Sequence, residues 1–224
     1  EKRPLWDTHN HVLSDIDDGP KTLEASIEIV DISVQNGVTG IVATPHSRSV
    51  LDAGGPAVLN DRLGRLNALI NERSIPIEVV PGMEIRLVPD AAAHLSEGHF
   101  ITLNGTSTAL VEFDYTQWAP YADQALFDIA ISGYNILLAH VERIVPLQEH
   151  PNRLIRYVER GYFSQITTAS VLGGFGNKAK KTAEYLLSKG AIHVVASDTH
   201  SSHGLREPWP TGIDERLEKL VGEN

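Results

Sequence analysis

Short apolar segments alternate with amphipathic segments along almost the whole chain, and this alternation restricts the fold more than any other feature. We predict seven strands, at residues 4–9, 39–46, 77–85, 108–113, 135–143, 162–170 and 191–200. Helices are expected at residues 22–37, 59–74, 121–133, 151–161, 177–190 and 211–224. In the first helix, apolar side chains recur at helical spacing between Thr22, a predicted N-cap, and Gly37, the predicted stop. Apolar strands that alternate with helices favour a parallel sheet covered by helices. The expected fold class is therefore α/β, as a distorted TIM-like barrel of seven strand–helix units, with a doubly wound open sheet as the alternative.

The composition limits the domain count and the partners. The chain has 224 residues, of which 42% are hydrophobic, and we expect a single domain over residues 1–224. It contains no Cys, which excludes disulfides, thiolate metal sites and a thiol nucleophile, and fits a cytoplasmic location. A formal net charge of −10 argues against a nucleic-acid partner. No apolar run approaches the roughly 20 residues that span a bilayer, so no membrane insertion is expected. A homo-oligomer is possible, and the outward face of the helix predicted at residues 22–36 is one candidate for the contact between copies.

Six of the seven predicted strands end in His, Asp or Glu. These residues are His9 and His11, His46, Glu84, Glu112, His140, Asp198 and His200. Because parallel barrel strands direct their carboxyl ends to one face, we expect these side chains to converge there. Carboxylates among apolar residues are costly to bury unless they are paired or bound to metal. Imidazole and carboxylate together suit Mn, Fe, Zn or Co better than Ca. The pattern predicts two or three ions, bridged by Glu84 or Asp198.

Each of these residues also has an ordinary structural interpretation. His46 could be a capping or core histidine, and Glu84 and Glu112 could be partners of arginines. Asp198 could cap the turn that follows it. Such interpretations would have to hold independently at six strand ends, which favours the metal hypothesis. The remaining histidines are predicted to lie away from the site: His94, His99, His150, His193 and His203.

Seven sequence motifs carry a resemblance to a known family: "DTHNHVLSDIDDGPKTLEAS", "GIVATPH", "PGMEI", "LVEF", "LLAHVER", "QITTASVLGGFG" and "VVASDTH". With them the chain resembles the polymerase and histidinol phosphatase (PHP) superfamily. It is most similar to the manganese-dependent protein-tyrosine phosphatases of bacterial capsule and exopolysaccharide operons, the CpsB type. The resemblance covers almost the whole chain and implies a PHP-type barrel with a trinuclear metal centre. The chain departs from the family pattern at Ser14-Asp15, at Ile144 and in "GLREPWP".

The resemblance implies a role for nine ligands and two arginines. It assigns His9, His11, Glu84 and Asp198 to one ion, Glu84, Glu112 and His140 to a second, and Asp18, His46 and His200 to a third. Within "DIDDG", Asp18 is the match because it directly precedes the glycine, which leaves Asp15 and Asp17 as loop residues. Arg143 and Arg206 would contact the phosphate as catalytic residues. The implied ions are Mn²⁺, with Fe, Zn, Co and Mg as alternatives.

The implied activity is that of a metal-dependent phosphotyrosine-protein phosphatase, in which a metal-activated hydroxide attacks phosphorus. Its implied partner is the tyrosine-rich tail of a kinase that regulates capsule or exopolysaccharide synthesis. A small-molecule phosphoesterase of the same superfamily, such as a histidinol-phosphate phosphatase, is the alternative. An open mouth would favour the protein substrate, and a lidded pocket the small molecule. A non-enzymatic binding module is the weakest hypothesis, because such a module would have lost ligands.

Overall fold

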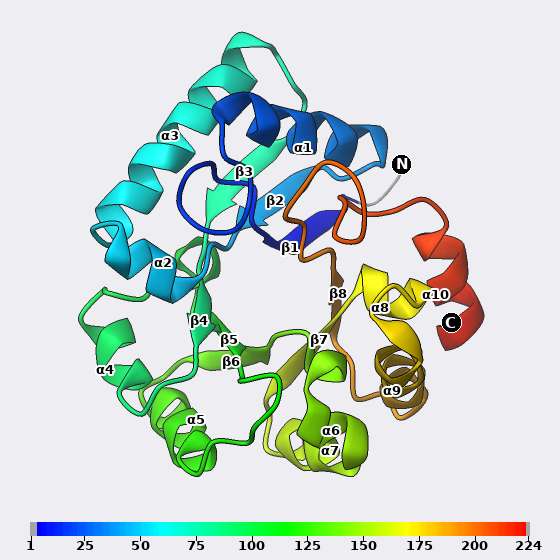
Figure 1. The fold of residues 1–224 in the computed structure, drawn as a ribbon. Helices are drawn as coiled ribbons and strands as arrows, with labels where there is room; N and C mark the ends of the chain where they lie inside the picture. Colours follow the sequence, from blue (N-terminus) through cyan, green and yellow to red (C-terminus); the bar gives the residue numbers. More distant parts are fainter. Residues whose placement is uncertain (1–3, 223–224) are drawn as a thin grey trace.

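The computed structural model describes residues 4–222, and its strands form a ring with helices around the outside (Figure 1). The strands form two sheets, of order β1-β2-β3 and β4-β5-β6-β7-β8, and every strand pair is parallel. They are β1 (Trp6–Asn10), β2 (Gly40–Ala43), β3 (Glu78–Pro81), β4 (Glu84–Arg86), β5 (Thr108–Glu112), β6 (Asn135–Leu138), β7 (Phe163–Thr167) and β8 (Val194–Ala196). The predicted α/β class with parallel strands is confirmed.

Isolated backbone contacts join the two sheets into the ring. Where β1 passes the end of β8, the Asp198 N–H donates to the His9 carbonyl at 2.9 Å, and an isolated bridge pairs Asn10 with Thr199. On the other side, the Glu84 N–H donates to the Pro45 carbonyl at 3.1 Å. The ring is therefore distorted, and its two sheets meet at single bridges instead of forming one continuous ladder.

The predicted third strand, residues 77–85, is divided between the two sheets. β3 ends at Pro81 and β4 begins at Glu84, so the chain passes from one sheet to the other at Gly82 and Met83. A Cβ atom at Gly82 would lie 2.7 Å from Cγ1 of Val42 in the neighbouring strand. Glycine therefore leaves room for the side chain of Val42 beside the chain at this step.

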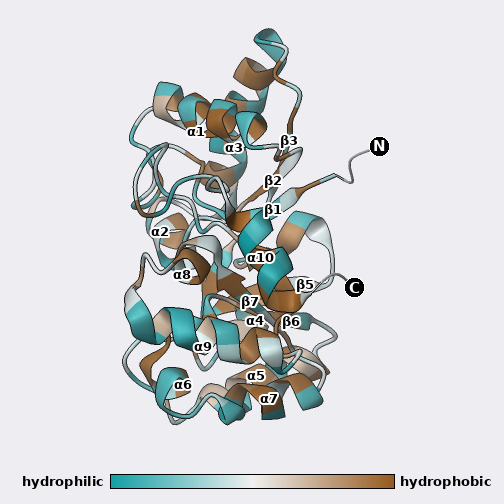
Figure 2. Cartoon of the chain, turned by 90° about the vertical axis from the view of Figure 1, so that its right-hand side faces the viewer, coloured by the Kyte–Doolittle hydropathy of each residue, from teal (hydrophilic) through white to brown (hydrophobic). Residues whose placement is uncertain are grey.

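Ten α-helices surround the strands in the described part of the chain. They are α1 (Leu23–Gln35), α2 (Ser47–Asp52), α3 (Pro56–Glu72), α4 (Ala91–Ser96), α5 (Ala122–Ile131), α6 (Val145–Glu149), α7 (Asn152–Glu159), α8 (Thr168–Leu172), α9 (Gly176–Ser188) and α10 (Ile213–Val221). Thr22 caps α1 as predicted, because its hydroxyl accepts the Ala25 N–H at 3.2 Å. Figure 2 shows hydrophilic residues along the outer side of α9, while strands and inward helix faces carry the hydrophobic ones. No helix within residues 4–222 combines the length and apolarity needed to cross a membrane.

Several predicted elements end elsewhere than expected, and three of them show why. The strand predicted at 135–143 stops at Leu138, because His140 takes a left-handed conformation (φ 32°) and residues 141–143 form the 3₁₀ turn η2 (Val141–Arg143). The strand predicted at 162–170 stops at Thr167, whose hydroxyl accepts the Ser170 N–H and begins α8. The helix predicted at 211–224 is α10, and its last two predicted residues lie outside the described range.

Candidate metal centre

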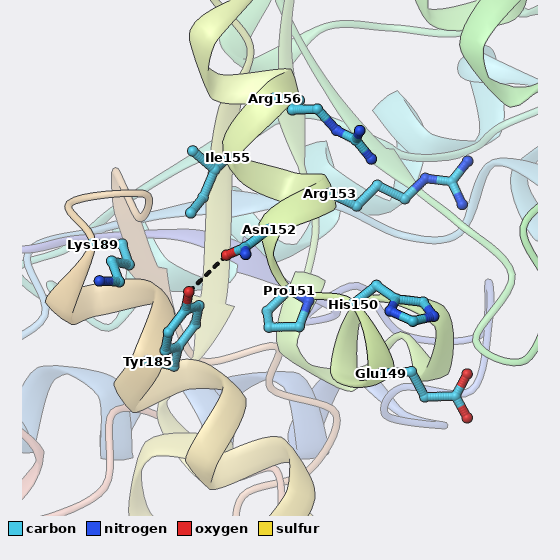
Figure 3. Close-up of a pocket in the computed structure, with 9 residues that line it drawn as sticks. All are labelled: Glu149, His150, Pro151, Asn152, Arg153, Ile155, Arg156, Tyr185 and Lys189. Carbon is cyan, nitrogen blue, oxygen red and sulfur yellow. Dashed lines mark hydrogen bonds between the residues drawn. The ribbon is translucent and has the colours of Figure 1, made fainter.

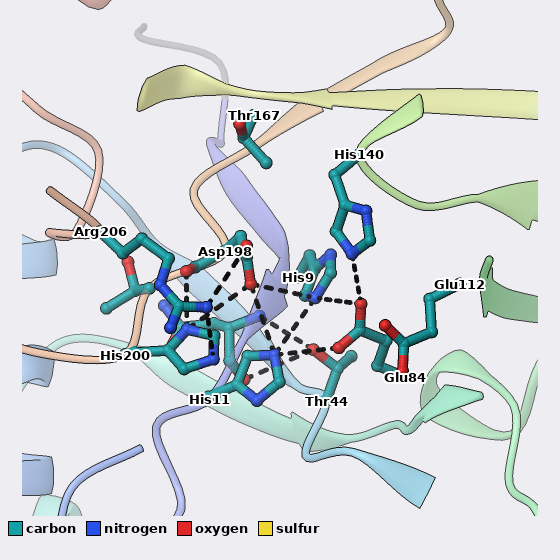
Figure 4. Close-up of polar contacts among 12 residues, drawn as sticks. His9, His11, Thr44, Glu84, Glu112, His140, Thr167, Asp198, His200 and Arg206 are labelled. Atoms are coloured by element: carbon teal, nitrogen blue, oxygen red, sulfur yellow. Dashed lines mark hydrogen bonds and ion pairs between the residues drawn. The ribbon is translucent and has the colours of Figure 1, made fainter. Parts of the chain in front are cut away.

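All nine predicted ligands lie together where the strands end, on the side from which the loops after β1, β2, β6 and β8 depart. Figure 4 labels seven of them, all except Asp18 and His46. Seven of them are buried: His9, His11, Glu84, Glu112, His140, Asp198 and His200. His46 and Asp18 are more open, with 28% and 56% of their side-chain surface exposed. The cluster is thus closed toward the strands and open on the side of Asp18.

The buried part of the cluster contains four side chains that point toward one another, those of His9, His11, Glu84 and Asp198 (Figure 4). The Nε2 atoms of His9 and His11 are 3.2 Å apart. Each lies 3.3–3.5 Å from the nearest carboxylate oxygens of Glu84 and Asp198. His9 approaches Oε1 of Glu84 and His11 approaches its Oε2, whereas both approach Oδ1 of Asp198. Donor atoms 3.2–3.5 Å apart have the spacing of ligands that lie about 2.1 Å from a shared Zn²⁺ or Mg²⁺ ion.

Hydrogen bonds behind the two imidazoles determine which nitrogen carries the proton. His9 Nδ1 donates to Gln165 Oε1 at 3.0 Å, and His11 Nδ1 donates to Asp17 Oδ2 at 2.7 Å. Both acceptors require an Nδ1–H, so in the neutral rings both Nε2 atoms keep their lone pairs. Two lone pairs that face each other at 3.2 Å repel unless a cation lies between them. This arrangement fits a divalent metal ion.

The charges of the site point to the same conclusion. Burial lowers the pKa of His9, but the charges of Glu84 and Asp198 outweigh it and raise the pKa overall. Burial opposes protonation of His11 as well, yet the bond to Asp17 holds its pKa well above the ordinary value. In the absence of metal, protonation at Nε2 is therefore favoured, and Nε2 is the atom that faces the position where a metal cation fits.

Glu84 connects the cluster. Its Oε1 lies 2.7 Å from His140 Nε2, and its Oε2 lies 2.7 Å from His46 Nδ1. Glu112 approaches the same His46 nitrogen at 3.6 Å, and burial together with the charge of Glu84 raises the pKa of Glu112 to about 7. Glu84 thus occupies the position expected of a bridging carboxylate.

Asp18 reaches the open side of the cluster despite the unusual Ser14-Asp15 sequence before it. Its Oδ1 lies 3.3 Å from His46 Nε2 and 3.1 Å from His200 Nε2. A donor atom of His11 lies within 4.8 Å of the donor atoms of these three residues. The three predicted ligand groups therefore form one continuous cluster.

Both predicted arginines reach the cluster. Arg143 Nη1 lies 2.5 Å from Asp198 Oδ2, and its guanidinium lies 4.7 Å from the Tyr115 ring centre and 4.0 Å from that of Phe175. Arg206 comes from the altered "GLREPWP" segment, yet its Nη1 lies 2.8 Å from His200 Nε2 and 3.8 Å from Asp198 Oδ2. Two guanidinium groups beside one carboxylate can bind an anion with several oxygens.

Sequence reasoning missed three residues that support the cluster. Asp17 lies in the loop after β1 as expected, but its side chain is buried and accepts a hydrogen bond from His11, so the expectation of a loop residue without a role in the site is corrected. Gln165 lies within β7, the strand that ends in no His, Asp or Glu, and its signal in the sequence was an amide inside a predicted strand. Tyr115 places its hydroxyl 3.2 Å from His140 Nε2. Asp15 is exposed and pairs with Arg62, as a loop residue would.

Two of the histidines predicted to lie away from the site contact each other. His94 Nδ1 and His99 Nδ1 are 3.3 Å apart, and Glu97 lies 3.2 Å from His99 Nδ1. His94, Glu97 and His99 form a separate, largely exposed group at the end of α4 and share no residue with the main cluster. His193 Nδ1 accepts the Ser164 N–H at 3.2 Å near the start of β7, away from the carboxyl ends of the strands as predicted.

The fold and the site together define a class: an α/β protein whose parallel strands carry a histidine–carboxylate cluster, with two arginines beside it, at their carboxyl ends. Residues 5–224 match the sequence model of the CpsB/CapC family, described as capsular polysaccharide synthesis. The chain belongs to this family, which confirms the resemblance predicted from its motifs.

Named relatives lead to the same family. The tyrosine-protein phosphatase YwqE of Bacillus subtilis (strain 168) is 35% identical over 197 residues, which cover 88% of this chain and 78% of YwqE. The tyrosine-protein phosphatase CpsB of Streptococcus agalactiae is 31% identical over 203 residues, covering 88% and 83%. A crystal structure from work on YwqE from Bacillus subtilis and CpsB from Streptococcus pneumoniae, described as unique metal-dependent tyrosine phosphatases, matches with a TM-score of 0.93 and 34% identity. That match covers 98% of this chain and 89% of the other.

Proposed function

We propose that this protein is a metal-dependent phosphotyrosine-protein phosphatase. The observation that carries the proposal is the pair of Nε2 lone pairs of His9 and His11, which face each other among carboxylates next to two arginines. The names of its relatives support the substrate. Three divalent ions, for which we favour Mn²⁺, would be held by the nine predicted ligands and would supply an activated water and charge neutralisation.

The arginines bind and orient the phosphate in this proposal. Arg143 is directed into the site by the rings of Tyr115 and Phe175, so little side-chain entropy is lost when it binds. Arg206 lies 3.8 Å from the same Asp198 oxygen that Arg143 contacts, and it can share the remaining phosphoryl oxygens. Both guanidinium groups stabilise the charge that spreads over these oxygens during transfer.

The leaving group needs little help from the protein. A tyrosyl phenolate has a pKa of about 10, so it leaves with less protonation than an alkoxide requires. Burial raises the pKa of Tyr115, whose hydroxyl therefore keeps its proton and can donate a hydrogen bond beside His140. A strong general acid is not required for a phosphotyrosine substrate.

The open side of the cluster favours a protein substrate over a small molecule. Asp18 and His46, which lie on that side, are partly exposed, so a phosphotyrosine that projects from a chain can approach. The family's description supports a role in capsular polysaccharide synthesis, and we propose a capsule-regulating tyrosine kinase tail as the substrate. The cytoplasmic location, the homo-oligomeric state and the single domain over residues 1–224 stay predictions.

The test compares two substrates. Purified protein loaded with Mn²⁺ is assayed on a phosphotyrosine peptide and on histidinol phosphate, with and without a chelator. We expect chelator-sensitive hydrolysis of the peptide at a much higher kcat/KM than for histidinol phosphate. Preference for histidinol phosphate would establish the small-molecule alternative, and no chelator-sensitive hydrolysis of either would overturn the proposal.

A further inference from the structure

The arginines of α7 differ from most others in this acidic chain. Seven of the eleven arginines in residues 4–222 lie within 4.0 Å of a carboxylate. The four that have no such partner among the described residues are Arg73, Arg153, Arg156 and Arg160. The last three recur at intervals of three and four residues along α7 and its C-cap, so they share one helix face. In a chain with a net charge of −10, three unneutralised guanidinium groups on one face are a local reversal of the overall charge.

These arginines line two adjoining hollows. The larger has a volume of about 810 Å³, and its walls come from α7, from the turn before α7 and from the end of α9 (Figure 3). It contains Arg153, Arg156 and Lys189, with Glu149 as the one acid among its lining residues. The bond from the Tyr185 hydroxyl to Asn152 Oδ1, at 2.6 Å, ties α9 to α7 across it.

The smaller hollow, of about 230 Å³, shares Arg153 and Arg156 with the larger one and adds Arg160. Its one acid is Asp123, which is already engaged as the acceptor of the Tyr157 hydroxyl. Because two arginines line both hollows, we treat them as one cationic surface and call it the α7 groove.

One loop links the α7 groove to the metal centre. The guanidinium of Arg153 lies 3.8 Å over the ring of Trp118. Trp118 follows Tyr115 by three residues, and Tyr115 contacts both His140 and Arg143. Three residues span at most about 11 Å, so Trp118, on which Arg153 stacks, lies close to Tyr115 at the edge of the metal centre.

We propose that the α7 groove binds acidic groups, either carboxylates or further phosphates, that flank the phosphotyrosine in the protein substrate. The inference rests on the proposed function and adds a specificity surface to it. Guanidinium groups bind both kinds of anion through paired hydrogen bonds, and stacking on Trp118 holds Arg153 ready for such contacts. Because the chain as a whole repels acidic peptides, a local cationic groove beside the site would draw them in and orient them.

The experiment measures the ratio of kcat/KM for a charged peptide to kcat/KM for a neutral one, so that a general loss of activity in a variant cancels. Three phosphotyrosine peptides are compared, with flanking glutamates, with a second phosphotyrosine, or with flanking glutamines. We expect the wild-type protein to favour the charged peptides over the glutamine peptide by roughly five- to tenfold in kcat/KM, mainly through KM. Preference for glutamates alone or for the second phosphotyrosine alone identifies the anion, and both results support the groove.

Variants show which arginines cause the preference for charged peptides. Arg153→Gln/Arg156→Gln should bring the ratio close to one, and Arg156→Gln/Arg160→Gln, which leaves the contact with Trp118 intact, should lower it in part. Arg73→Gln is the matched control, because Arg73 is also without a carboxylate partner in the described residues but follows α3. The ratio should also shrink at high salt, where exposed charges are screened. An unchanged ratio in both double variants, or an equal loss in Arg73→Gln, would overturn the inference.

Binding separates this inference from the proposed function. The same charged and glutamine peptides, labelled with a fluorophore, are titrated with the protein and followed by anisotropy. Tighter binding of the charged peptide that is lost in Arg153→Gln/Arg156→Gln would support the groove even if no peptide were hydrolysed. Equal binding of charged and neutral peptides to the wild-type protein would count against it, whatever the activity.

Discussion

His11 Nδ1 lies 2.7 Å from Asp17 Oδ2, and this contact makes the loop after β1 part of the metal centre. The same carboxylate accepts the Gly19 N–H at 2.9 Å and the His46 N–H at 3.2 Å. One buried side chain therefore orients the ring of one predicted ligand and holds the backbone of another. Burial raises the pKa of Asp17, but the bond from His11 outweighs it, so the pKa is lowered overall and the carboxylate stays ionised.

Replacing Asp17 should weaken metal binding without removing a predicted ligand. Asp17→Ala frees the His11 ring to rotate and change tautomer, and we expect a loss of 10- to 100-fold in Mn²⁺ affinity, the usual range for such supporting residues. Calorimetric titration of the metal-free protein measures it. Asp15→Ala is the control, because Asp15 is 75% exposed and pairs with Arg62. Equal affinities for the two variants would show that the His11 contact has no role in metal binding.

Removing His140 should abolish activity while the fold is kept. His140→Ala removes one predicted ligand and leaves Glu84 Oε1 without its 2.7 Å partner, but it alters no core packing beyond one ring. We expect loss of phosphotyrosine hydrolysis with an unchanged far-ultraviolet circular dichroism spectrum. His203→Ala, at a side chain that is 76% exposed, should keep full activity. Full activity in His140→Ala would mean that the cluster is not the catalytic site.

Arg143 should not be replaceable by lysine. Arg143→Lys keeps a positive charge but loses the planar fork and the packing between Tyr115 and Phe175. We expect kcat on a phosphotyrosine peptide to fall by about 10²–10³-fold, the usual cost of removing one donor to the transition state. Steady-state kinetics separate this loss in kcat from a change in KM. A variant with unchanged kcat would place Arg143 outside the reacting centre.

The ring of Tyr115 and its hydroxyl should have separable effects. Tyr115→Phe keeps the packing on Arg143 and loses only the contact with His140, whereas Tyr115→Ala loses both. We expect a larger fall in kcat for Tyr115→Ala than for Tyr115→Phe, because the guanidinium loses one of its two aromatic walls. Tyr121→Ala is a control of the same size, because the ring of Tyr121 is exposed and its hydroxyl donates to the Leu87 carbonyl. Equal losses in the two Tyr115 variants would assign the effect to the hydroxyl.

The stability of the metal-free protein should depend on pH through Glu112. Burial and the charge of Glu84 raise the pKa of Glu112 from 4.5 to about 7, so the folded state holds a proton that the unfolded state has released. The free energy of unfolding should therefore fall as the pH rises from about 4.5 to about 7, by on the order of 1–3 kcal/mol from this group. Urea unfolding in the presence of chelator should show this slope reduced in Glu112→Gln. Glu78→Gln, at an exposed glutamate of β3, should keep the wild-type slope. A Glu112→Gln slope equal to the wild type would contradict the shift.

Much of the fold followed from local patterns. Apolar strands and amphipathic helices alternate in the chain itself, so the α/β class and the position of α1 between Thr22 and Gly37 could be predicted. The direction of the chain in each strand–helix unit is also local, and it places strand-end residues such as His140 and Asp198 on one face. These features could be predicted because residues close together in the sequence determine them.

Element ends were predicted less well, because single side chains decide them. Thr167 ends β7 by capping α8, and His140 ends β6 by adopting a left-handed backbone. Gly82 lies where the chain crosses between the sheets, and it has no room for a side chain because a Cβ would lie 2.7 Å from Cγ1 of Val42 in β2. Apolar periodicity continues through all three positions and gives no sign of the change.

The sequence by itself determined the fold class, the family and the residue types that gather at the strand ends, since all of these depend on local periodicity and motif spacing. Tertiary structure alone decided which polar residues support them. His9 depends on Gln165, 156 positions away, and Arg206 comes within 3.8 Å of Asp198 although its surrounding motif is altered. Such contacts depend on burial and on the direction of side chains from separate strands, and these exist only once the ring has closed.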